Sequence, residues 1–168
     1  MKKAEEEPGN MKKSAYVLPI IVAFFVIFLD QISKYFFITQ FKINESVPVI
    51  KNIFHLTVTK NTGGAFSFFS GNNSVFFWLS IIIIGILLYS LGQFPKNNLV
   101  LISMGFILGG AIGNILDRIF YGGVVDFLDF RIWPVFNFAD SFITLGVAGI
   151  LIYYFKEELF KKKKKKYK

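Results

Sequence analysis

The stretch that decides the fold reads GGAIGNILDR at residues 109 to 118, VVDF at 124 to 127 and FNFAD at 136 to 140. An uncharged hydrophobic run lies on each side of it. Six acidic residues lie between the terminal tails, and four of them fall between residues 109 and 140: Asp117, Asp126, Asp129 and Asp140. Because carboxylates are costly next to a bilayer, such acids are functional-site candidates. Asp126 and Asp140, each expected at the mouth of a span, indicate acid/base chemistry at the membrane surface.

The composition is that of a membrane protein. The chain has 168 residues, of which 54% are hydrophobic, and its mean hydropathy is +0.52, too apolar for an ordinary soluble domain. We expect one integral-membrane domain over residues 1 to 168, with polar tails at 1 to 13 and 156 to 168. The tails carry +7 of the net charge of +8. Nucleic-acid binding would need basic residues interleaved with aromatic ones on one folded face, so we expect no nucleic-acid partner.

The chain contains no cysteine and a single histidine, His55. These counts exclude disulfides, a cysteine nucleophile, thiolate metal sites and any two-histidine zinc motif. We therefore expect no metal and no cofactor. Any chemistry must use carboxylates, amides, hydroxyls, lysine or arginine.

Four hydrophobic segments predict transmembrane helices: about residues 15 to 38, 75 to 92, 99 to 116 and 138 to 155. The first would be a helix of roughly 36 Å, enough to cross a hydrocarbon core of about 30 Å. Glycines spaced by four in the third segment predict close packing against a neighbouring helix. The fold class is therefore an α-helical membrane protein with four transmembrane helices.

The connecting and terminal segments are polar. Residues 39 to 74 cannot span a membrane, and within them residues 55 to 59 alternate and are rich in β-branched side chains, which predicts a strand. Residues 1 to 13 are expected to be disordered. They do not begin a signal peptide, because the hydrophobic run after them is too long and no small-residue cleavage pattern follows it.

The distribution of basic residues predicts the topology. Four spans put both termini on one side, and the termini together with Lys96 hold thirteen of the nineteen basic residues, so this side is cytoplasmic. The lysine run at residues 161 to 166 would attract anionic phospholipid. The Asp30 end of the first span, residues 39 to 74 and the acids Asp126 and Asp140 then meet at the outer face.

Two carboxylates placed a few Å apart cannot easily both ionise, so they share a proton and divide the work. The charged one takes a proton from water, while the protonated one polarises a scissile carbonyl. Peptide-bond hydrolysis fits this pattern without a metal, thiol or histidine. Asn114 and Arg118 lie on one helical face. With Asn137, they would orient the acids or the substrate backbone by hydrogen bonds.

Two local interpretations remain open from the residues alone. Asp30 and Lys34 lie four apart on one helical face. Either they form a structural ion pair or Lys34 reaches the membrane interface, or else Asp30 faces the cleft and orients other side chains there. The glycine turn at residues 61 to 67, which includes Gly63, is either a simple hairpin turn or a place where the backbone approaches a ligand.

Three other functions fit less well. A serine/lysine peptidase would use Ser33 and Lys34, but adjacent residues on a helix point about 100° apart. A proton-coupled transporter would commonly show internal repeats with broken helices, and the two halves of the chain are not similar. A membrane scaffold would have no need for Asn114, Arg118, Asp126 and Asp140 together.

Five blocks in register resemble lipoprotein signal peptidase, the bacterial signal peptidase II. They are DQISK at 30 to 34, NTGGAFS at 61 to 67, GGAIGNILDR at 109 to 118, VDF at 125 to 127 and FNFAD at 136 to 140. The resemblance covers all four spans, about residues 15 to 155. One position departs from the pattern, since Gly64 stands where the family usually has alanine.

The resemblance implies an aspartic peptidase of the bacterial cytoplasmic (inner) membrane. It would remove the signal peptide of a prolipoprotein, cutting before the cysteine that carries a diacylglyceryl group. It also implies a β-cradle at the outer face built from residues 39 to 74, and sensitivity to globomycin. We expect the enzyme to act as a monomer.

The family motifs also imply the site residues. Asp126 and Asp140 match the catalytic pair. The positions expected to support the site or bind substrate are Asp30, Lys34, Asn61, Gly63, Asn114, Arg118 and Asn137. A lipid-modified substrate suits acids at the membrane edge, because its acyl chains would hold the scissile bond at the interface.

Overall fold

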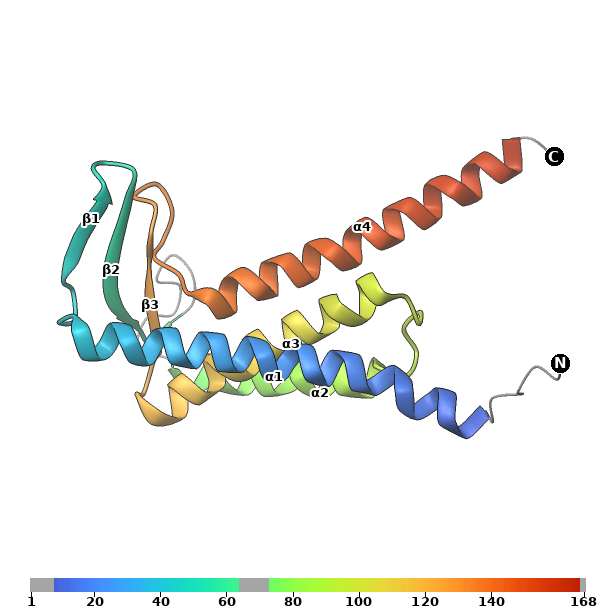
Figure 1. Ribbon diagram of the computed structural model, residues 1–168, viewed down its shortest axis with the longest axis horizontal. Coiled ribbons are helices and arrows are strands. Elements are labelled where there is room, and N and C mark those ends of the chain that lie inside the picture. Colours follow the sequence, from blue (N-terminus) through green and yellow to red (C-terminus); the bar gives the residue numbers. More distant parts are fainter. Residues whose placement is uncertain (1–7, 64–72, 167–168) are drawn as a thin grey trace, which may run out of the picture.

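A computed structural model describes residues 8 to 63 and 73 to 166 (Figure 1). Its helices are α1 (Pro8–Gln40), α2 (Asn73–Ser90), α3 (Asn98–Phe120) and α4 (Phe138–Lys166), and its strands are β1 (Ser46–Ile50), β2 (Phe54–Asn61) and β3 (Val124–Asp129). The helices run along the long axis, and the strands stand across one end of them. The prediction of four apolar helices with a small sheet is confirmed, and all four helices are long and apolar enough to cross a membrane.

Helix α3 lies at the centre of the bundle. Of the most apolar part of α3, 72% is buried inside the protein, compared with 0% for α2, which leaves the surface of α2 available to lipid. Glycines allow the close contacts: a Cβ at Gly109 would lie 2.7 Å from the carbonyl oxygen of Ala23 in α1, and one at Gly110 would lie 2.5 Å from that of Ala139 in α4. The predicted small-residue packing of this helix is therefore confirmed.

The sheet is antiparallel, with strand order β1-β2-β3. Strand β2 contains the strand predicted at residues 55 to 59. Strand β3 pairs with it, with Asp126 opposite Thr59, and packs on the helix ends, since the ring of Phe127 stacks on Phe37 of α1 at 4.2 Å between centroids. The cradle thus includes a strand from outside residues 39 to 74.

Two expectations need correction. Asp126 lies on strand β3 and not at the mouth of a span; the strand is buried on both faces, so its sequence lacks the alternation that marks a half-buried strand. Residues 8 to 13 are helical, because Pro8 stands at the first helical position, where proline is tolerated. The polar tail continues α4 as far as Lys166.

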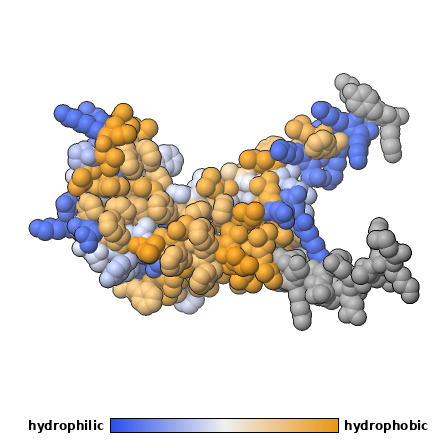
Figure 2. All heavy atoms as spheres, in the orientation of Figure 1, coloured by the Kyte–Doolittle hydropathy of each residue, from blue (hydrophilic) through white to orange (hydrophobic). Residues whose placement is uncertain are grey.

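The surface follows this arrangement. Figure 2 shows hydrophobic side chains over the helical part and hydrophilic ones towards its two ends, including the lysine-rich end of α4. The sheet also carries hydrophobic side chains on its exposed surface. This distribution is typical of a protein whose helices cross a bilayer and whose sheet lies at its edge.

Gly109→Ala should destabilise the protein, because the new methyl group would meet the backbone of α1 and force the helices apart. We expect a loss of about 1–3 kcal/mol in the free energy of unfolding, measured as a lower midpoint of thermal unfolding in detergent. Gly85→Ala is the matched control, since a Cβ at Gly85 meets nothing within 4 Å. Equal midpoints for the two variants would contradict this account of the helix contact.

Candidate active site

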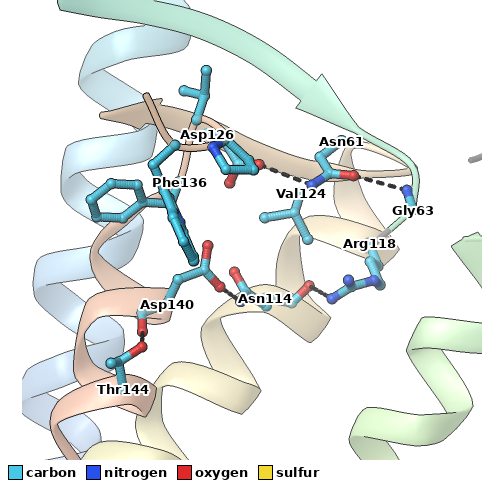
Figure 3. Close-up of a pocket in the computed structure, with 12 residues that line it drawn as sticks. Asn61, Gly63, Asn114, Arg118, Val124, Asp126, Phe136, Asp140 and Thr144 are labelled. Atoms are coloured by element: carbon cyan, nitrogen blue, oxygen red, sulfur yellow. Dashed lines mark hydrogen bonds between the residues drawn. The ribbon is translucent and has the colours of Figure 1, made fainter. Parts of the chain in front are cut away.

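Asp126 and Asp140 lie on different elements but line the same cavity. Asp126 is on strand β3, and Asp140 is in the first turn of α4. The cavity has a volume of about 240 Å³, and four other predicted site residues line it: Asn61, Gly63, Asn114 and Arg118. Figure 3 shows these side chains around the cavity, with the two aspartates on adjoining walls. The rest of the predicted glycine turn, from Gly64, lies outside the described residues.

Asn137 connects the two aspartates. Its Nδ2 donates to Asp126 Oδ1 at 2.7 Å, while its Oδ1 accepts from the backbone N–H of Asp140 at 2.9 Å. The second contact is that of a helix N-cap with the third helical residue. Asn137 is fully buried. The motif Asn-Phe-Ala-Asp thus begins α4 and holds both aspartates through a single amide.

Each aspartate also receives an amide from a further element. Asn114 Nδ2 of α3 donates to Asp140 Oδ1 at 2.8 Å. Asn61 Nδ2, at the end of β2, donates to Asp126 Oδ2 at 3.1 Å, and Asn61 Oδ1 accepts from the N–H of Gly63 at 2.9 Å. Each of the three asparagines predicted around the site therefore donates to an acid: Asn61 and Asn137 to Asp126, and Asn114 to Asp140.

Lys34 and Asp30 lie behind the cavity, out of contact with solvent. Lys34 Nζ is 2.8 Å from Asp30 Oδ2, with side-chain exposures of 1% and 0%, so the lysine does not reach the interface. It also donates to Asn114 Oδ1 at 3.0 Å. Of the two open interpretations, the structure shows the buried ion pair; Asp30 does not line the cavity, and it is Lys34 that contacts Asn114, the partner of Asp140.

Arg118 does not bond to either acid in the described part of the chain. Its Nη1 donates to the backbone carbonyl of Asn114 at 3.1 Å, and its guanidinium lies 5.8 Å from the ring centroid of Phe76 in α2. Its Nε is buried and has no hydrogen-bond partner among the described residues. Of the two tasks expected of Arg118, a hydrogen bond to an aspartate is not formed, while an interaction with the substrate backbone stays a prediction.

The sequence analysis did not place Asp117 in the site. This buried residue forms an ion pair with Lys34 at 2.8 Å, and its Oδ2 accepts from the N–H of Val125 at 3.0 Å. One signal could have pointed to Asp117: it follows the predicted site residue Asn114 by three residues, so the two lie close together on the surface of one helix. Its second partner belongs to a strand that the sequence did not reveal.

The surroundings of Asp126 favour its protonated form. Burial raises the pKa of Asp126 from its ordinary value of 3.8 to about 7, and the nearby Asp140 carboxylate adds to the rise. Hydrogen bonds from Asn61 and Asn137 act in the opposite direction and are outweighed. A carboxyl with such a pKa can hold or release a proton near neutral pH. Among the described residues, no three acidic, histidine or cysteine side chains converge to hold a metal ion.

Comparisons with known proteins agree with this arrangement. Residues 22 to 156 match the family model of signal peptidase (SPase) II. The chain is 44% identical over 138 residues to the lipoprotein signal peptidase of Halothermothrix orenii, covering 82% of this chain and 95% of that one. It is 47% identical over 136 residues to that of Nostoc punctiforme, covering 79% and 85%.

A solved structure has the same fold. It is that of a bacterial membrane enzyme, which superposes with a TM-score of 0.77 at 36% sequence identity and covers 83% of this chain and 88% of the other. The helices and the sheet described above are therefore those of a known membrane-enzyme architecture.

Asp126→Asn should change how stability depends on pH. Since the folded-state pKa is raised above 3.8 to about 7, wild type loses stability as the pH rises from about 4 to about 7. The unfolding free energy of Asp126→Asn, measured relative to that of wild type, should therefore rise by up to about 4 kcal/mol between pH 4 and pH 8. Thermal unfolding in detergent across this range measures it.

Asp129→Asn is the control on the same strand. Hydrogen bonds and the Arg131 charge lower the pKa of Asp129 against the opposing effect of its burial. Its stabilising effect is present above about pH 4 and is lost only as the pH falls below that value, so the stability difference between wild type and this variant should stay nearly constant between pH 4 and pH 8. Parallel curves for wild type and Asp126→Asn would contradict the raised pKa of Asp126.

Proposed function

Since the chain belongs to the signal peptidase II family, and is therefore an aspartic peptidase that removes signal peptides from prolipoproteins, we propose that Asp126 and Asp140 are its catalytic pair. One observation carries this proposal: the two carboxyl groups line one cavity, and the buried amide of Asn137 binds both the carboxyl of Asp126 and the backbone N–H of Asp140. The cavity is bordered by further hydrogen-bond donors, Asn61, Asn114 and Arg118.

The two acids would share one proton in the resting enzyme. The ionised acid takes a proton from a water molecule, whose oxygen attacks the scissile carbonyl carbon, while the protonated acid donates to the carbonyl oxygen. When the tetrahedral intermediate collapses, the carbon–nitrogen bond breaks and a proton passes to the leaving amine. The raised pKa of Asp126 favours a proton on the pair at neutral pH. The pair titrates jointly, so the proton belongs to both.

The amides and the arginine would have separate tasks. Asn61, Asn114 and Asn137 donate to carboxylate oxygens, and they would keep the acids aimed at the scissile bond. Arg118 lines the cavity and retains a buried Nε without a partner among the described residues. This donor would bind a carbonyl of the substrate backbone, while the turn at Gly63 would let the peptide approach the backbone of β2.

The substrate would be a prolipoprotein whose cysteine already carries a diacylglyceryl group, with cleavage just before that cysteine. The location of Asp140 supports this, because the first turn of α4 marks one end of a span. Acyl chains would keep the scissile bond at that level, so the peptide need not enter the hydrocarbon. A globomycin-type cyclic peptide would compete for the same cavity.

The enzyme would lie in the bacterial cytoplasmic membrane, with both termini in the cytoplasm and the cavity at the outer face. The sheet and the lysine-rich end of α4 lie at opposite ends of the helices (Figure 1), and lysines favour the cytoplasmic side. The exposed lysines at that end, among them Lys161 and Lys162, would contact anionic phospholipid.

The loop after β3 would contact phospholipid of the outer leaflet. Ile132 and Trp133 are 93% and 58% exposed. The loop is held in shape: Arg131 adopts a φ of 64°, its N–H donates to Asp129 Oδ1 at 2.8 Å, and its Nη1 donates to Asp129 Oδ2 at 2.9 Å. An isoleucine and a tryptophan presented in this way suit a membrane interface.

Cleavage by aspartate variants tests the catalytic pair. In a gel-shift assay with a diacylglyceryl-modified prolipoprotein in detergent, Asp126→Asn and Asp140→Asn should each lower turnover at least about a thousandfold, because neither can share the proton. Asp129→Asn is the control, since Asp129 does not line the cavity. A folded Asp140→Asn enzyme that cleaves within tenfold of wild type would contradict the proposal.

Tryptophan fluorescence tests the membrane contact of the loop. The chain has two tryptophans, so Trp78→Phe leaves Trp133 as the sole probe in vesicles. Its emission should be quenched by lipids brominated on the acyl chains and protected from iodide in water. Trp133→Phe, which leaves Trp78 on the exposed face of α2, is the positive control. Quenching of Trp133 by iodide but not by brominated lipid would contradict the contact.

A further inference from the structure

Two buried acids outside the proposed catalytic pair hold the backbone next to it. Asp30 Oδ1 accepts from the N–H of Ala139 at 2.9 Å, and Ala139 directly precedes Asp140. Asp117 Oδ2 accepts from the N–H of Val125 at 3.0 Å, and Val125 directly precedes Asp126. The residue before each catalytic aspartate therefore donates its backbone N–H to a different buried acid, Asp30 in one case and Asp117 in the other.

The two buried acids are in turn linked to each other. Lys34 Nζ lies 2.8 Å from Asp30 Oδ2 and 2.8 Å from Asp117 Oδ2. Gln31 makes a second link, since its Nε2 donates to Asp30 Oδ2 at 3.2 Å and to Asp117 Oδ1 at 2.9 Å. A continuous path of short contacts thus joins the backbone before Asp140 to the backbone before Asp126.

The surrounding packing leaves these groups little freedom. A Cβ at Gly113 would lie 2.5 Å from Asp30 Oδ2, so the glycine is what allows this carboxylate to approach α3. On the side of Asp126, the carbonyl of Val125 accepts from Asn137 Nδ2 at 3.3 Å. Val125 is thus held at both its N–H and its carbonyl.

We propose that Asp30, Gln31, Lys34 and Asp117 form a positioning cluster that sets the separation of the two catalytic aspartates. The inference rests on the proposed role of Asp126 and Asp140. None of the four cluster residues lines the cavity, so they act on the catalytic acids through the backbone and through Asn114, and not on the substrate.

Stability alone does not explain the cluster. Removing charges from water is costly, and replacing a buried ion pair with well-packed hydrophobic residues is often neutral or stabilising. Lys34, Asp30 and Asp117 are each no more than 1% exposed. Their use lies in geometry: Asp30 of α1 binds the backbone of α4, Asp117 of α3 binds the backbone of β3, and the two catalytic acids belong to these two elements.

The kinetics of Asp117→Asn test the cluster. Asparagine has one acceptor oxygen in place of two and carries no charge, so it cannot serve Val125, Lys34 and Gln31 together. We expect kcat to fall about tenfold to hundredfold, as for a misplacement near 1 Å, while KM stays within about threefold of wild type. The apparent pKa values in the pH profile of kcat should also move, because the coupling of two acids depends on their distance.

Two further variants complete the experiment. Glu158→Gln is the matched control, an acid-to-amide change in an exposed ion pair at the far end of α4, and it should leave kcat and the pH profile unchanged. Gln31→Met keeps every charge of the cluster and removes one of its two links. It should lower kcat less than Asp117→Asn does, and it serves as the test if Asp117→Asn does not fold.

The outcomes separate this inference from the proposed function. If folded Asp117→Asn or Gln31→Met has the kcat and pH profile of wild type, the positioning role of the cluster is overturned. A lower unfolding midpoint with unchanged kinetics is what a purely structural role would give. If Asp126→Asn and Asp140→Asn are inactive at the same time, the catalytic pair stands and only the cluster fails. Activity in those two aspartate variants overturns the pair and the cluster with it.

Discussion

The structure depends on how a few buried charges are balanced. Asp30 and Asp117 share a buried lysine, Lys34, so one of their two negative charges is compensated. Asp126 and Asp140 contact no lysine or arginine within hydrogen-bond distance among the described residues, and amides are their partners. Neutral donors stabilise a carboxylate less than a cation does. The negative charge of the pair is therefore not compensated by a cation, which favours the binding of a proton that the two acids share.

The packing of the helices is what allows this arrangement. Glycines on α3 let α1 and α4 approach its backbone, so side chains from three helices meet at one end of the bundle. Strand β3 follows α3 directly and is pinned there by Asp117 and by the stacked ring of Phe127. Acids that are distant in sequence thus meet on two rigid elements, which suits chemistry that needs exact spacing.

Much of this could be predicted from the sequence, and the failures have physical causes. Long apolar runs revealed the four helices, and the motifs around Asn114 and Asn137 pointed to side chains that do meet the acids. Strand β3 was missed because burial on both faces removes the alternation on which strand prediction depends. Asp117 was missed with it, since one of its partners lies on that strand and the other, Lys34, lies in a distant helix.

The central claim is that the uncompensated pair holds a proton near neutral pH, and infrared spectroscopy can observe this directly. Protonated carboxyl groups have a carbonyl stretch that carboxylates lack, so a pH titration of the enzyme in lipid follows them. We predict a carboxyl band in wild type that disappears with a midpoint near pH 7, following the pKa of about 7 for Asp126, and that is missing in Asp126→Asn. Complete loss of carboxyl bands below about pH 5, as for ordinary aspartates and glutamates, would contradict the claim.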